Sequence, residues 1–333
     1  MSINVLGIES SCDETAAAVV SDGREIISNV IATQVPWHKA YGGVVPEIAS
    51  RKHLEFINPV VKKALTDAKL TLNEIDAVAV TYGPGLVGGL LVGLSAAKAI
   101  AYSRDLPLIG VNHIEGHIYA NFLAYSELEA PLVCLTVSGG HTTLLFIEEM
   151  GSYEIIGQTR DDAAGEAFDK ISRVLGLGYP GGPAIEKAAK DGDSQAFSFP
   201  KALPDELDFS FSGLKTAVIN MAHNAEQKGE KVDINDVAAS FQEAVIEVLV
   251  EKTIKAAKLK RVDRVLLSGG VASNQRLRDQ LDKACAKEGL ALYYPPKVLC
   301  TDNAAMIACC GYYRYLKGDR AKWDLNADPR LGL

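Results

Sequence analysis

Residues 5–20 read VLGIESSCDETAAAVV, and residues 132–147 read LVCLTVSGGHTTLLFI. When Thr15 is aligned with Thr142, each stretch shows an apolar strand, a polar or glycine turn and a second apolar strand. Few positions are identical, so the two openings resemble each other in structure more than in sequence. Because apolar runs alternate with helical patterns along the chain, we predict two tandem α/β lobes, each opened by a strand–turn–strand hairpin.

Further strands end in glycine turns or lead into helices. IDAVAVTYGPG at 75–85 predicts a strand before the helix at 89–102, and PLIGV at 107–111 predicts another. A strand at 262–267 runs into SGGVASN, where Ser273 or Asn274 would cap the next helix. Glycine turns and helix N-termini present backbone N–H groups to anions. The turns SCDET, SGGHT and SGGVASN therefore favour a nucleotide cleft between the lobes over coincidental loops.

Composition limits the possible functions. The 333 residues carry a net charge of −8, so broad electrostatic binding of nucleic acid by the whole surface is excluded. Local basic stretches occur at 255–261 and 312–322, although a solvated helix face is the favoured interpretation of each taken alone. No segment resembles a signal peptide or a membrane span, and the six cysteines form no C-x-x-C pair. We expect a reduced, cytoplasmic protein.

The segment VNHIEGHIYA at 111–120 holds two histidines with helical spacing. On an α-helix His113 and His117 share one face and could bind one metal ion, although both could also be ordinary surface or core histidines. A zinc peptidase would need a glutamate directly after the first histidine. Glu115 lies one position further on, about 200° around the helix from His113, so it would point away from the metal. The pattern therefore argues against a peptidase.

A third metal ligand is expected in CTDNAAMIA at 300–308. Asp302 would lie at the start of the final helix, where the helix dipole favours a carboxylate; a helix N-cap is its alternative role. Two imidazoles and one carboxylate leave coordination positions open. Such a site suits the polarisation of a substrate oxygen better than a structural role.

Ten motifs in order across the chain together resemble the TsaD family, which transfers threonylcarbamoyl groups to tRNA. The motifs are GIESSCDETAAAVV, GGVVPEIASRKH, YGPGLVGGLLVG, VNHIEGHIYA, VSGGHT, AAGEAFDK, YPGGP, FSFSGLKTA, GGVASN and TDNAAMIA. The resemblance implies the two-lobed actin/Hsp70/sugar-kinase (ASKHA) fold with a central cleft between the lobes. It also implies transfer of the threonylcarbamoyl group of threonylcarbamoyl-adenylate to N6 of adenosine 37, with release of AMP, in tRNAs that read codons beginning with adenine.

The same resemblance assigns residues. One metal ion, expected to be iron with zinc as the alternative, would be held by His113, His117 and Asp302. The acidic residues Asp13 and Glu14 of the first turn would lie near the phosphate, and Glu14 is a candidate general base. Glu186 stands where the family often has aspartate. The implied contacts of the adenylate substrate are Thr136, Val137, Ser138, Gly139, Gly140, Asp169, Gly182, Glu186 and Asn274. Taken alone, Asp169 could be a surface charge, Gly182 a turn residue and Asn274 only a cap.

The resemblance also implies partners and domain limits. The expected partners are tRNA, a TsaB-like paralogous subunit and a TsaE-like ATPase. We predict a first lobe of residues 1–128 and 318–333, with partner-binding helices at about 46–68, and a second lobe of 129–317. The predicted apolar stripe of those helices consists of Ile48, Leu54, Ile57, Val60, Val61 and Leu65. That stripe could instead pack on its own lobe. A kinase or ATPase of the same fold is the alternative function.

Overall fold

The computed structural model describes residues 2–229 and 231–333. These residues form two compact units. The first contains the chain up to Leu128 together with Pro295–Leu333, and the second is Glu129–Tyr294. None of the described helices is both long and apolar enough to span a membrane.

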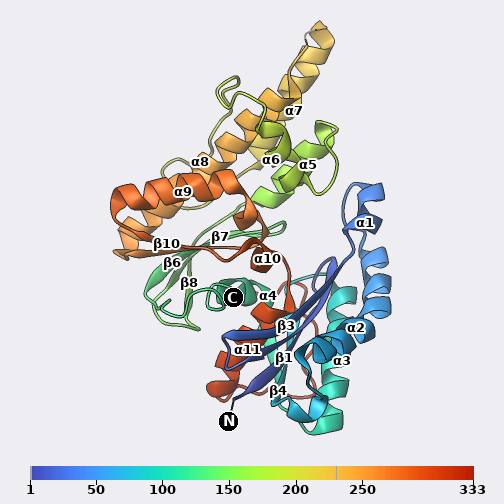
Figure 1. Ribbon diagram of the computed structural model, residues 1–333. Coiled ribbons are helices and arrows are strands. Elements are labelled where there is room, and N and C mark those ends of the chain that lie inside the picture. Colours follow the sequence, from blue (N-terminus) through green and yellow to red (C-terminus); the bar gives the residue numbers. More distant parts are fainter. Residues whose placement is uncertain (1, 230) are drawn as a thin grey trace. The chain divides into compact units, whose positions relative to one another are not determined.

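The first unit is built on a sheet with the strand order β3-β2-β1-β4-β5 (Figure 1). β1 pairs antiparallel with β2 and parallel with β4, and β4 pairs parallel with β5. The strands are β1 (Asn4–Glu9), β2 (Glu14–Ser21), β3 (Glu25–Thr33), β4 (Ala77–Gly83) and β5 (Leu108–Asn112). The helices are α1 (Val35–His38), α2 (Pro46–Ala68), α3 (Val87–Arg104), α4 (His113–Tyr119), α10 (Lys297–Cys300) and α11 (Ala304–Leu316).

Helices cover both faces of this sheet. Leu6 and Ile8 of β1 belong to one core cluster with apolar residues of α2 and α3. Because strand side chains alternate, Gly7 faces the opposite side, where α11 packs. A Cβ at Gly7 would lie only 2.3 Å from the carbonyl oxygen of Ala304. The glycine therefore allows the first turn of α11 to approach β1 closely.

The second unit repeats this topology with the strand order β10-β9-β6-β7-β8. β6 pairs antiparallel with β7 and parallel with β9, as β1 does with β2 and β4. The strands are β6 (Leu132–Val137), β7 (Thr142–Ile147), β8 (Tyr153–Gln158), β9 (Arg264–Ser268) and β10 (Ala291–Tyr293). The helices are α5 (Ala164–Val174), α6 (Gly181–Ala189), α7 (Ser212–Lys228), α8 (Ile234–Lys260) and α9 (Gln275–Glu288). The pattern shared by 5–20 and 132–147 thus corresponds to equivalent hairpins in two sheets of the same topology.

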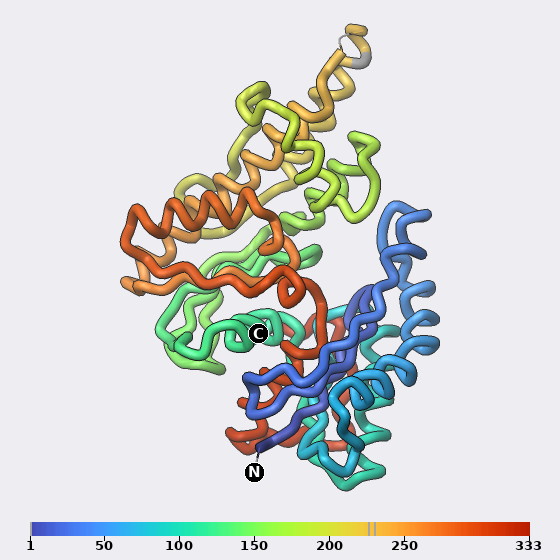
Figure 2. Tube along the Cα trace, in the orientation of Figure 1, coloured from blue at the N-terminus to red at the C-terminus, as the bar shows by residue number. Residues whose placement is uncertain are grey.

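The limits of the units differ from the predicted lobes at one point. The chain leaves the first unit after Leu128, at the position predicted, but it returns at Pro295 and not at residue 318. Figure 2 shows the red C-terminal segment lying against the blue strands of the first unit. The reason is α11, whose buried apolar face packs on β1, β2 and β4. Residues 295–317 therefore belong to the first unit.

The predicted stripe on α2 is also only partly correct. Ile57, Val60 and Val61 are buried in the core of the first unit, in line with packing on its own lobe. Leu54, in contrast, is 65% exposed, because the buried face of α2 passes through Ala49 and His53 instead.

Candidate functional site

Polar side chains of the first unit gather where its parallel strands end. β1 ends at Glu9, β4 at Gly83 and β5 at Asn112. In an α/β sheet the carboxyl ends of parallel strands meet at one edge, where ligands bind. α4 starts directly after β5, and the side chain of Asn112 caps it by accepting a hydrogen bond from the N–H of Ile114 at 2.8 Å. This cap places His113 and His117 at the carboxyl edge.

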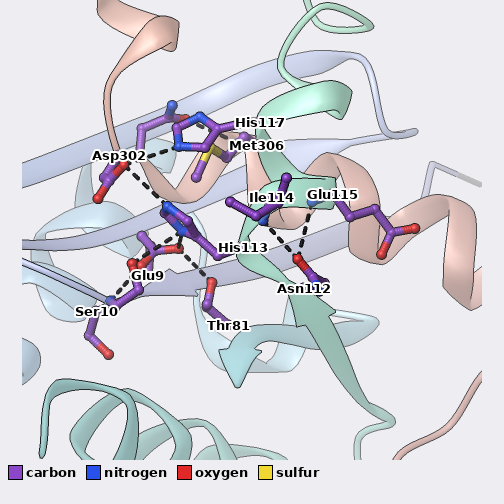
Figure 3. Close-up of polar contacts among 12 residues, drawn as sticks. Glu9, Ser10, Thr81, Asn112, His113, Ile114, Glu115, His117, Asp302 and Met306 are labelled. Atoms are coloured by element: carbon purple, nitrogen blue, oxygen red, sulfur yellow. Dashed lines mark hydrogen bonds and ion pairs between the residues drawn. The ribbon is translucent and has the colours of Figure 1, made fainter. Parts of the chain in front are cut away.

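α11 brings Asp302 to the same edge. Asn303 caps this helix and accepts a hydrogen bond from the N–H of Met306 at 3.0 Å. The alternative role of Asp302 as the N-cap is therefore filled by its neighbour. The carboxylate of Asp302 is left to face the two histidines (Figure 3).

The three predicted metal ligands converge in the structure. Oδ1 of Asp302 lies 3.2 Å from Nε2 of His117 and 3.5 Å from Nε2 of His113. One ligand atom from each residue lies within 4.8 Å of the other two. Nδ1 of His117 is buried without a hydrogen-bond partner among the described residues, and its buried Nε2, although beside the Asp302 carboxylate, forms no regular hydrogen bond there. A buried polar atom normally has a partner, and a metal ion would supply one to Nε2. The donor set of two imidazoles and one carboxylate therefore fits a transition metal.

The electrostatics of the site also favour a cation. Burial opposes ionisation of Asp302, but the neighbouring imidazoles of His113 and His117 outweigh burial and hold the pKa of Asp302 well below its usual range. Burial likewise opposes protonation of His113, yet the nearby Asp302 and Glu9 carboxylates raise its pKa well above the usual value. The carboxylates beside the two histidines therefore favour positive charge at this site.

Glu115 points away from this cluster, as the helical spacing predicts (Figure 3). Its Oε2 accepts a hydrogen bond from Nη1 of Arg314 at 2.7 Å. A glutamate committed to an arginine on another helix cannot serve as the base of a metallopeptidase at the histidines.

The acidic turn between β1 and β2 belongs to the same unit. Asp13 is buried, and Oε1 of Glu14 accepts a hydrogen bond from the hydroxyl of Thr33 at 3.1 Å. Burial, followed by the neighbouring carboxylates of Asp13 and Asp302, raises the pKa of Glu14 well above its ordinary value. A carboxylate with a raised pKa is a stronger proton acceptor once it is ionised.

The predicted substrate contacts all lie in the second unit. Thr136 and Val137 end β6, and the Thr136 hydroxyl is 2.9 Å from that of Ser268 on β9. In the turn that follows, Ser138 pairs with the backbone of His141, while Gly139 and Gly140 are exposed. A Cβ at either glycine would have no neighbour within 4 Å. The turn therefore presents open backbone, which suits contact with a ligand.

Two predicted carboxylates accept hydrogen bonds from the first residues of helices in the second unit. Oδ1 of Asp169 on α5 accepts a hydrogen bond from the N–H of Gly181, the first residue of α6, at 2.7 Å. Oε1 of Glu186 on α6 accepts one from the N–H of Gln275, the first residue of α9, at 2.9 Å. The lengthened side chain of Glu186 therefore contacts the N-terminus of a helix.

Asn274 and Gly182 have separate roles. The side chain of Asn274 caps α9 through the N–H of Leu277 at 3.0 Å and donates to Gln242 at 2.8 Å. The expected cap is thus confirmed at Asn274, and Ser273 is not the capping residue. A Cβ at Gly182 would contact nothing within 4 Å, so this glycine leaves the backbone open at the start of α6.

Two residues of the site were not anticipated from the sequence. Glu9 and Thr81 are both buried, and the hydroxyl of Thr81 donates to Oε2 of Glu9 at 2.5 Å. Glu9 in turn contacts Nδ1 of His113 at 3.0 Å. The sequence did contain a signal for Glu9, which is a charged residue at the end of an otherwise apolar strand. Lys, Arg, Asp and Glu are rarely fully buried unless paired, so a partner for Glu9 could have been expected.

Comparisons with known proteins agree with this geometry. The model of the TsaD family, described as tRNA N6-adenosine threonylcarbamoyltransferase, matches residues 25–309. The chain is 57% identical to a protein of that name from Clostridium botulinum strain Hall, over 100% of this chain and 98% of the relative. It is 58% identical to one from Clostridium perfringens strain SM101, over 99% of this chain and 98% of the relative.

Solved structures with low identity support the fold. HypF from T. kodakarensis has a TM-score of 0.64 at 16% identity, covering 97% of this chain and 49% of that one. Component A of (R)-2-hydroxyglutaryl-CoA dehydratase from Acidaminococcus fermentans has a TM-score of 0.56 at 15% identity, covering 94% and 99%. The two sheets of equal topology and these likenesses establish the ASKHA fold. With the family match spanning most of its length, the chain belongs to the TsaD family of tRNA N6-adenosine threonylcarbamoyltransferases.

Proposed function

We propose that this chain transfers the threonylcarbamoyl group of threonylcarbamoyl-adenylate to N6 of adenosine 37 in tRNAs that read codons beginning with adenine. The observation that carries the proposal is the convergence of His113, His117 and Asp302, which could hold a metal ion, in a chain related over its full length to enzymes with that name. A tRNA substrate would place the reaction in the cytoplasm. The alternative kinase or ATPase activity has no comparable support among the relatives.

The reaction is an acyl transfer from a mixed carbamoyl–phosphate anhydride. The N6 amine attacks the carbamoyl carbon, the bond from that carbon to the phosphate oxygen breaks, and AMP leaves with the electron pair. The amine nitrogen gives up one proton. A metal ion, which we expect to be iron with zinc as the alternative, would be held by His113, His117 and Asp302 and would act as a Lewis acid towards an oxygen of the substrate.

Residues of the second unit would hold the adenylate. The open backbone of Gly139 and Gly140, and that of Gly182 at the start of α6, would offer N–H groups to phosphate and ribose oxygens. Preformed donors of this kind position an activated acyl group and stabilise charge on a departing phosphate. Glu14 of the first unit is the proposed acceptor of the proton lost by the amine.

An exposed apolar surface of the first unit supports the proposed TsaB-like partner. Leu54 of α2 is 65% exposed, and Val87 and Leu91 of α3 are 52% and 43% exposed. The two helices pack closely, since a Cβ at Gly88 would lie 2.0 Å from the hydroxyl oxygen of Ser50. Exposed apolar side chains on two closely packed helices suit a protein–protein interface. Neither this surface nor the metal site indicates where a TsaE-like ATPase would bind, so that partner rests on the family alone.

The test is reconstitution with preformed threonylcarbamoyl-adenylate and unmodified tRNA, followed by mass spectrometry of the nucleosides. We expect multiple turnovers only with the TsaB-like and TsaE-like partners, because the acidic chain offers few phosphate contacts to tRNA. The protein–protein complex should survive high salt, whereas tRNA binding should weaken steeply. Full turnover by this chain alone would contradict the partner requirement, and absence of the modified nucleoside under all conditions would contradict the function.

A further inference from the structure

A fully buried carboxylate lies behind one of the two histidines. Glu9 is the last residue of β1 and is 0% exposed. Alternation along the strand places it on the same face as Gly7, under α11, and not on the face of Leu6 and Ile8. Figure 3 shows its side chain directed towards the ring of His113. Burial of a carboxylate is costly unless the charge is paired, so this position needs an explanation.

Both carboxylate oxygens of Glu9 contact hydrogen-bond donors. Oε1 accepts from the N–H of Ser11 at 2.6 Å. Oε2 accepts from the hydroxyl of Thr81 at 2.5 Å and lies 3.0 Å from Nδ1 of His113. Among the described residues no lysine or arginine forms an ion pair with Glu9, so the imidazole is its basic partner.

This geometry determines which nitrogen of His113 carries a proton. An ionised carboxylate can only accept hydrogen bonds, so Nδ1 must donate to Glu9. In the neutral ring the lone pair is then on Nε2, the atom that faces Asp302 at 3.5 Å. The hydroxyl of Ser11, 3.1 Å from the same Nδ1, can donate or accept and does not impose this choice.

We propose that Glu9 is a positioning residue that fixes His113 as an Nε2 ligand and thereby sets the affinity of the site for a divalent cation. The proposal rests on the metal-binding part of the proposed function. Carboxylates that accept a hydrogen bond from a metal-bound histidine orient its ring and increase its basicity. Among the described residues His117 has no such partner on its buried Nδ1, so the two histidines are supported differently.

The decisive variant is Glu9→Gln, which keeps the shape and removes the charge. If the amide NH2 of the glutamine side chain takes the place of Oε1, it faces the N–H of Ser11, and two hydrogen-bond donors then oppose each other. If it replaces Oε2, it faces His113 and forces Nδ1 to accept, which moves the ring proton to Nε2 and blocks metal binding. In metal-free full-length protein titrated with Zn²⁺ against a chromophoric chelator, we expect the dissociation constant to rise by about ten- to a hundredfold.

Ser10→Ala is the matched control. It removes the neighbouring buried hydrogen bond from the Ser10 hydroxyl to the carbonyl of Gly89, 2.9 Å long, without contacting His113. This variant should bind Zn²⁺ as the parent does, and the visible spectrum of bound Co²⁺ should change in Glu9→Gln alone. Equal affinity of Glu9→Gln and the parent would overturn the role of Glu9 but leave the metal site intact. A parent protein that binds neither ion would overturn the metal site as well.

A measurement on the unchanged protein decides the question if Glu9→Gln does not fold. In the Zn²⁺-bound protein with ¹⁵N-labelled histidine, the ring of His113 should show metal-bound Nε2 and a slowly exchanging proton on Nδ1. Ser11→Ala should shift the Nδ1 signal and so assign it. Metal binding through Nδ1 of His113 would contradict the proposal.

Discussion

Glu115 and Arg314 form an ion pair, with 2.7 Å between Oε2 and Nη1, that joins α4 to α11. Glu115 is 5% exposed, and the positive charge of Arg314 compensates its negative charge. The ion pair links α4, which carries both histidines, to α11, which begins just after Asp302. It therefore serves the architecture of the site and takes no part in its chemistry.

Arg314→Met should destabilise the protein strongly, because it leaves a buried carboxylate without its partner. We expect a loss of about 3 kcal/mol in the free energy of unfolding, measured by denaturant titration. The double variant Glu115→Leu with Arg314→Met should recover most of this loss, since it also removes the stranded charge. A double variant as unstable as Arg314→Met would show that packing, and not charge, is responsible.

Replacement of the metal ligands should separate binding from folding. His113→Ala combined with His117→Ala should abolish the one transition-metal ion expected per chain, and Asp302→Asn should weaken its binding severely. Asn303→Ser should retain the metal, because serine still supplies a capping oxygen to α11. Elemental analysis of the purified proteins is the measurement, and undiminished metal in the double histidine variant would contradict the assignment.

The protein should cleave no glycoprotein or peptide substrate. Its only glutamate between the two histidines is engaged by Arg314, and a metallopeptidase needs a base beside the metal-bound water. Fluorogenic peptides incubated with the metal-loaded enzyme provide the assay. Metal-dependent cleavage that disappears in Glu115→Gln would contradict this expectation.

Asp169→Ala should weaken adenylate binding and leave the metal content unchanged. The variant frees the N–H of Gly181 and loosens the first turn of α6, which belongs to the second unit, whereas all three metal ligands belong to the first. Calorimetry with a non-hydrolysable adenylate should show a loss of about tenfold, the effect of one charge-assisted hydrogen bond. Unchanged affinity would remove Asp169 from the substrate site.

Acidic pH should weaken the hydrogen bonds by which Asp161 holds the residues at the start of α7. This carboxylate accepts hydrogen bonds from the N–H groups of Phe211 and Ser212, at 2.8 and 3.2 Å, and from the Ser210 hydroxyl, at 2.5 Å. Burial opposes its ionisation, but these bonds prevail and lower its pKa. A depressed pKa means that the stabilisation is present above the unfolded pKa, near 4, and is lost as the pH falls through the folded value.

Asp161→Ala should therefore cost about 1 kcal/mol at pH 7, the value of a helix cap, and progressively less below pH 4. The free energy of unfolding is to be compared between the parent and the variant across this pH range. A difference that stays constant down to pH 2 would show that the carboxylate charge is not involved.

The sequence alone was sufficient for the hairpins and for the shared helix face of the two histidines. Alternating apolar runs with polar turns predict β1, β2, β6 and β7, and the histidine spacing predicts a shared helix face at His113 and His117. It was insufficient for β3 and β8, which lie at sheet edges and carry mixed polar and apolar residues without a clear period. Edge strands are half exposed, and their burial pattern depends on neighbours that a linear pattern does not reveal.

The supporting residues of the site were hidden for a different reason. Glu9 and Thr81 are far apart in the sequence and meet only because β1 and β4 pair in parallel. The position of residues 295–317 depends on Gly7, whose lack of a side chain lets α11 pack closely on β1. A single glycine in a strand does not show which segment of the chain packs against it. Long-range pairings of this kind become visible once the topology is known.

The return of residues 295–333 to the first unit has a consequence for biosynthesis. On the ribosome, His113 and His117 emerge before the whole second unit, and Asp302 emerges after it. The second unit is continuous in the chain and can fold as soon as it is made, whereas the first must wait with an uncovered sheet face for α11. Nascent chains stalled before residue 295 should thus expose apolar surface to chaperones and bind no metal, so that the cation would be acquired only after synthesis has passed Asp302.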